Sequence, residues 1–160
     1  MSYANNLCHK AQLSVQAYLV AAVEAADPTL TLIAAEKIFA GMGDSAVTAT
    51  RVVCTCRSAE NEESLFEGNW MADMEVMTRA PASDTTEAEF HLLCSEIWAH
   101  FFVSEEDLLT GLSNATVEFT AFKVYVRNQS WDIEAGGDGT SAEWVSRLMF
   151  QIKCCGSVVG

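Results

Sequence analysis

The sequence has 160 residues, half of them apolar and 19% charged, which is enough apolar material for one folded domain with an ordinary core. Its 22 acidic and 9 basic residues give a formal net charge of −13. Because an acidic surface repels phosphate, this charge argues against a protein that clamps DNA or RNA through Lys and Arg. The longest apolar runs, such as 18–23, fall well short of the roughly 20 residues that cross a membrane.

The first third of the chain predicts a helix followed by strands. Apolar residues at three- and four-residue spacing predict a helix over 5–26, which ends before Pro28. A short strand is expected around 37–39, and the β-branched run 48–56 predicts a second strand. The polar, acidic stretch 58–68 is expected to be an exposed hairpin loop.

The middle of the chain predicts a strand and two helices. Residues 69–80 alternate, with Trp70, Ala72, Met74 and Val76 on one face. Asp84 and Glu87 are spaced like a capping pair for a helix that runs to about Val103. Ser104 then caps a short helix over 108–112.

Two further strands are expected in the last third, over 117–126 and 143–155, joined by a long polar connection over 128–142. In the first of them, Phe119, Ala121, Lys123 and Tyr125 are predicted to face away from Thr120, Phe122 and Val124. The order of elements predicts a single α+β domain over 1–160, with two helices packed on one face of a mainly antiparallel sheet.

Some apolar residues fall on strand faces that two helices cannot cover. They are Met71, Met77, Phe122 and Val124. Such positions often mark contacts between subunits, so we expect an interface there. A sheet folded over on itself is the alternative interpretation.

No pattern of a catalytic, cofactor-binding or metal-binding site is found. The six cysteines include no Cys-x-x-Cys pair, and they are expected to be reduced and free of metal. His91 and His100 lie too far apart on one helix to share a metal. The segment 136–139 is rich in glycine but lacks the Lys-Ser/Thr of a phosphate-binding loop.

Short phrases along the chain resemble the small neck and tail-completion proteins of long-tailed bacteriophages, especially tail terminators. These phrases are Phe66-Glu67-Gly68-Asn69-Trp70, Arg79-Ala80-Pro81, the helix that contains Glu89 to Cys94, and the final strand from Arg147 to Gly156. No single motif among them is specific, and the likeness is one of layout.

The resemblance implies a structural virion protein and no enzyme. Such a protein assembles in the host cytoplasm as a ring of about six copies on the tail tube, ends tube growth and meets the head–tail connector or stopper. Genomic DNA passes through its lumen without specific binding, which the acidic charge would suit. The alternatives are another neck or tail component, such as a stopper, adaptor or tube subunit, or a soluble accessory binding module.

The two polar loops are expected to contact neighbouring subunits and to line such a lumen, since a long loop in a small domain is usually ordered by a partner. Their acidic residues are Glu60, Glu62, Glu63, Glu67, Asp132, Glu134 and Asp138. Solvated loops on an outer rim are the alternative interpretation.

Overall fold

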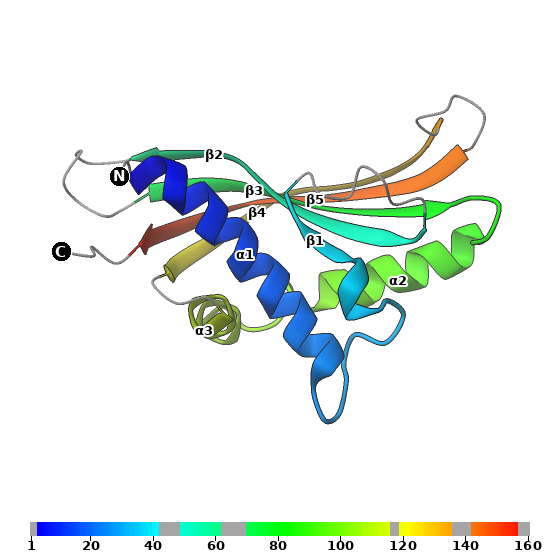
Figure 1. Cartoon of the computed structure of the whole chain (residues 1–160), viewed down its shortest axis with the longest axis horizontal. Helices are drawn as coiled ribbons and strands as arrows, with labels where there is room; N and C mark the ends of the chain where they lie inside the picture. Colours follow the sequence, from blue (N-terminus) through cyan, green and yellow to red (C-terminus); the bar gives the residue numbers. More distant parts are fainter. Residues whose placement is uncertain (1–2, 42–48, 62–69, 116–118, 136–141, 157–160) are drawn as a thin grey trace.

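The computed structural model describes residues 3–41, 49–61, 70–115, 119–135 and 142–156. Three helices lie on one side of a five-stranded sheet with the strand order β1-β2-β3-β5-β4 (Figure 1). All neighbouring strands are antiparallel except β1 and β2. The predicted α+β class and mainly antiparallel sheet are therefore confirmed, and the short helix predicted over 108–112 packs on the same side as the two helices expected there. The elements are α1 (Tyr3–Glu24), β1 (Ile38–Ala40), β2 (Arg51–Asn61), β3 (Trp70–Pro81), α2 (Glu87–Ala99), α3 (Glu105–Ala115), β4 (Phe119–Ala135) and β5 (Ala142–Gly156).

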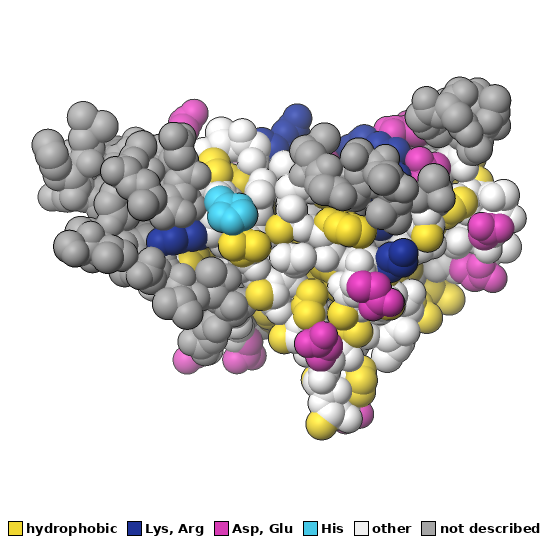
Figure 2. Space-filling view, in the orientation of Figure 1, with side chains coloured by type: hydrophobic (Ala, Val, Ile, Leu, Met, Phe, Trp, Pro, Cys, Tyr) yellow, Lys and Arg dark blue, Asp and Glu magenta, His cyan; other side chains and the backbone are white. Residues whose placement is uncertain are grey.

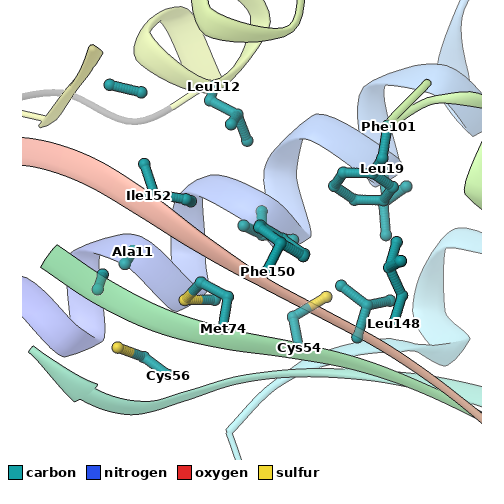
Figure 3. Close-up of a cluster of buried hydrophobic side chains, with 14 of the residues drawn as sticks. Ala11, Leu19, Cys54, Cys56, Met74, Phe101, Leu112, Leu148, Phe150 and Ile152 are labelled. Carbon is teal, nitrogen blue, oxygen red and sulfur yellow. The ribbon is translucent and has the colours of Figure 1, made fainter. Parts of the chain in front are cut away.

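The main core lies between α1 and the sheet. Leu7, Ala11, Val15 and Leu19 form the buried stripe of α1 at helical spacing. They pack with side chains from β2, β3 and β5, including Met74 (Figure 3). On β3 the burial alternates strictly from Trp70 onward, as the sequence predicted. No helix in the described part of the chain is long and apolar enough to span a membrane.

The start and end of α2 differ from the prediction. The N-cap is Thr86 rather than Asp84, and its hydroxyl accepts a 3.2 Å hydrogen bond from the backbone N–H of Glu89. The Glu89 carboxylate accepts a bond from the Thr86 N–H in return, so both ends of the capping box are satisfied. The helix ends at Ala99, four residues before the predicted end, because the chain turns there toward the Ser104 cap of α3.

Two segments predicted as loops are strands. β2 continues through 58–61, where it pairs with β3, and β4 continues through 128–135, where it pairs with β5. Both segments are polar. Each lies farther from the centre of the sheet than the strand with which it pairs. Their side chains can remain in water while the backbone completes the ladder, so composition alone is a weak guide to such strands. Residues 62–68 and 136–141 lie outside the described residues.

The predicted alternation along β4 is also wrong, because the strand contains two irregularities. The register with β5 shifts between Ala121 and Lys123 and again between Val126 and Asn128. An extra residue in one strand moves the following side chains to the opposite face. As a result, Val124 pairs with the buried Ile152 and packs against the main core.

Candidate interaction surfaces

The helix-free face of the sheet carries a network of ion pairs. Arg51 on β2 and Glu143 on β5 form its inner pair, with Nη1 and Oε2 2.8 Å apart. Arg79 on β3 lies between them and approaches Glu143 to 3.6 Å. Arg79 also contacts Glu134 of β4 at 3.2 Å. Four strands that are distant in sequence are thus tied together on this face.

A second branch of the network runs along β5. Arg147 contacts Glu134 at 3.0 Å and Glu75 of β3 at 3.7 Å. Arg57, in the irregularity of β2, reaches Glu75 from the other side at 3.5 Å. Each of these arginines is paired with a carboxylate of the same chain. The ion pairs therefore connect the strands, and this face is not cationic overall.

Met71 and Met77 lie on this same face, as the alternation predicted. Both are half-buried, and their cross-strand neighbours on β5 are Lys153 and Arg147. On the β2 side, Met71 is opposite Glu60 and Met77 is opposite the buried Val53, so charged residues surround Met71 more than Met77.

Charge is divided unequally between the two layers of the domain. β2, β3, β4 and β5 together carry seven basic and six acidic residues, whereas the three helices carry one basic and seven acidic residues. Figure 2 shows Asp and Glu side chains over both the upper part, where the strands lie, and the lower, helical part, with Lys and Arg side chains at the upper margin and also lower on this face. The helix layer is therefore acidic, whereas these four strands are close to neutral.

The outer half of β4 is the most exposed regular segment. All nine residues from Tyr125 to Ile133 are exposed, although they form a continuous strand. β4 is the last strand of the sheet, so its outer backbone groups have no neighbouring strand among the described residues. Four large side chains on this segment are between 43% and 48% exposed: Tyr125, Val126, Trp131 and Ile133.

Helices cover only part of the inner side of β4. α3 lies over its beginning, where Ser113 accepts a 2.9 Å hydrogen bond from the Ala121 N–H. α2 packs instead on β5, through stacking of Phe90 on Trp144 at a ring distance of 6.4 Å. Past Val124, the apolar side chains of β4 extend beyond the helix layer.

One aromatic cluster holds Trp131 at the margin of that layer. Its ring lies 4.7 Å from His91 of α2 and 6.1 Å from Trp144 of β5. The Trp144 indole N–H donates a 2.9 Å hydrogen bond to the Thr85 carbonyl and so fixes the cluster against the start of α2. Trp131 thus has a defined position while nearly half of its surface stays exposed.

The sequence prediction missed Trp131 and Ile133 because they fall in the segment predicted as a loop. A usable signal was present: both are strand-forming residues at alternate positions. Phe122, predicted for an interface, is 46% exposed, while Val124 is half-buried.

The predicted acidic residues do not share one environment. Glu60 on β2 and Asp132 on β4 are exposed, on strands at opposite sides of the sheet. Glu134 is paired with two arginines in the network described above. Glu62, Glu63, Glu67 and Asp138 lie outside the described residues.

No group of three or more His, Cys, Asp or Glu side chains in the described residues is placed to hold a metal ion. All six cysteines are free thiols. Burial raises the pKa of Cys54 and Cys154 to about 12 and that of Cys94 to about 11. Thiols held in the protonated form are poor nucleophiles, and these three side chains pack as small apolar groups in the core clusters.

These features define an α+β domain whose distinctive surfaces are sheet faces and edges. No protein-family model matches the chain, and no curated protein sequence matches it. Among solved structures, a chain of the virion of a native gene transfer agent particle is similar in fold, with a TM-score of 0.50 and 11% identity. The likeness covers 88% of this chain and 94% of that one. At this identity it establishes a shared fold.

Proposed function

We propose that this protein is a structural subunit of a phage-like virion and that it forms the ring, of about six copies, which terminates the tail tube. The observation that carries the proposal is the fold shared, over nearly the whole of both chains, with a protein of a gene transfer agent virion. The sequence phrases that resemble tail terminators point to the same class independently.

The surfaces of the domain support a role in assembly. A protein that works alone rarely keeps a long, exposed edge strand, because unpaired strand edges recruit other chains. The edge strand β4 is exposed over nine consecutive residues and carries Phe122 before them. In the proposed ring this edge is buried between copies, together with Met71 and Met77 of the helix-free face. Val124, half-buried in the monomer, adds little new area.

The division of charge supports passage of DNA. A lumen lined by acids repels the phosphate backbone and lets DNA slide without binding. The helices carry seven acids and one base, and we propose that this layer faces the lumen. The exposed acids Glu60 and Asp132 lie on β2 and β4, where we propose that they contact neighbouring copies. The tail-tube protein and the head–tail connector or stopper are the proposed partners at the two ends of the ring.

Deletion of the gene from the particle-producing cell tests this function. Without a terminator, tube growth has no defined end, so tails of irregular length and unjoined heads should accumulate. Expression of the wild-type chain should restore tails of uniform length. Tails of normal length with unjoined heads would instead assign the protein to a stopper or adaptor. Complete, infectious or transducing particles from the deletion strain would exclude any essential role in the virion.

A further inference from the structure

We infer that the outer half of β4, from Tyr125 to Ile133, is the surface by which one copy of this chain docks on the β2 side of the next copy. Its inner side carries Val126, Trp131 and Ile133, which we call the β4 strip. This inference rests on the proposed function for the arrangement of the copies in a ring. The evidence for the contact itself is the geometry of this edge.

The two edges of the sheet are different and lie on opposite sides. Among the described residues, no strand pairs with the outer side of β4, whereas at the other edge β1 covers only 52–54 of β2. Farther along β2, the Cys56 N–H is occupied by the side-chain carbonyl of Gln12 at 3.0 Å. Past it, residues 58–61 have no strand on their outer side in the described part of the chain. A contact that joins unlike edges is heterologous, and a heterologous contact builds a closed ring when the rotation between copies closes, as in the proposed ring.

Charge selects a second copy as the occupant. The segment 125–133 holds one base, Arg127, and one acid, Asp132, so it is neutral within a chain of net charge −13. Two such chains repel each other through their acidic helix layers and approach most easily through a neutral surface. Nucleic acid would need a basic surface, and a strongly basic partner would favour the helices.

The size of the surface fits a stable contact. Nine residues of extended strand span roughly 30 Å, which is long enough for an ordinary protein–protein interface. Trp131 is the largest apolar side chain of the segment and is pre-positioned by His91 and Trp144. Rigid aromatic side chains of this kind contribute most of the binding energy in many interfaces.

Variants that change the net charge equally distinguish the role of the β4 strip from that of the rest of the surface. Val126→Glu and Trp131→Glu should each weaken self-association of the full-length chain at least ~tenfold in sedimentation or native mass measurements. Leu92→Glu is the control, because Leu92 is 63% exposed on α2 and the substitution changes the net charge equally. Val126→Lys lowers the net negative charge and should still weaken association. Thermal unfolding of each variant identifies any loss of fold, since Trp131 also packs within its own chain.

Photo-cross-linking identifies the occupant directly. A benzoylphenylalanine in place of Gln129, which is exposed on β4, should cross-link to peptides of β2 or α1 from a second copy. Cross-links to β4 of the second copy, no cross-linked dimer up to the solubility limit, or equal association of Trp131→Glu and Leu92→Glu would each overturn the inference. If the chain associates through the β4 strip and yet the deletion strain makes normal particles, the docking surface stands and the proposed virion function fails.

Discussion

Arg51 and Glu143, 92 residues apart in the sequence, form a 2.8 Å ion pair whose side chains are only 9% and 12% exposed. The pair joins β2 to β5 across β3, on the face that no helix covers. Removing the carboxylate of a buried pair weakens the compensation of the remaining buried charge, which costs more than the intact pair contributes.

Glu143→Gln should therefore lower the free energy of unfolding by about 3 kcal/mol, measured by urea denaturation. The matched control is Glu105→Gln, which breaks the 2.9 Å pair with Lys123 where both side chains are more than 40% exposed. That control should change stability little. Equal effects of the two substitutions would show that the inner pair is not structurally important.

Gly111 of α3 packs directly against the ring of Tyr18. A Cβ at this position would lie 2.6 Å from Cε2 of Tyr18. The ring cannot easily yield, because its hydroxyl donates a 2.5 Å hydrogen bond to the His100 carbonyl and its edge packs on Phe101. Gly111→Ala should gain about 1 kcal/mol in helix propensity but lose more to overpacking, for a net loss of about 1–2 kcal/mol.

A double mutant tests the cause of that loss. In a Tyr18→Leu background, the Gly111→Ala change should become neutral or stabilising, since the clash is gone. An unchanged loss in that background would place the strain elsewhere in α3.

Buried thiols should make the protein sensitive to alkaline pH. Cys54 and Cys154 have their pKa raised from 9.0 to about 12 by burial, and Cys94 to about 11. Because the folded-state pKa values are raised, the unfolded chain loses its protons first. The associated stability is complete below pH 9 and is lost as pH rises toward 11 to 12, by about 1.4 kcal/mol per pH unit for each thiol. Cys54→Ala should reduce the slope of the free energy of unfolding against pH by the contribution of one thiol. An unchanged slope would show that burial does not raise the pKa of Cys54.

Thiol labelling should separate the cysteines by burial. Six free thiols should react in denaturant, as expected for a protein that folds in a reducing compartment. In the native protein, only the half-buried Cys8 and Cys155 should react at once. Fewer than six thiols in freshly prepared, denatured protein would reveal a disulfide or a bound metal.

Prediction from the sequence was most accurate for helices and strands that are buried on one side only. β3 alternates because its two faces differ, and the α1 stripe repeats because one side of the helix is buried, so both could be predicted from spacing. The outer half of β4 was missed because its residues stay exposed and are mostly polar, so the alternation of Trp131 and Ile133 was the only local signal for a strand. The same cause hid Trp131 and Ile133 from the predicted interface. Pairing of Glu134 with Arg79 and Arg147 depends on strand register, which local sequence does not specify.

The most direct test of the central claim is a cryo-electron reconstruction of the junction between head and tail in particles that contain this chain. We expect a single closed ring of about six copies at the head-proximal end of the tube, with Trp131 of each copy buried against its neighbour. A reconstruction that places the chain along the whole tube, or as isolated copies with Trp131 in solvent, would contradict it.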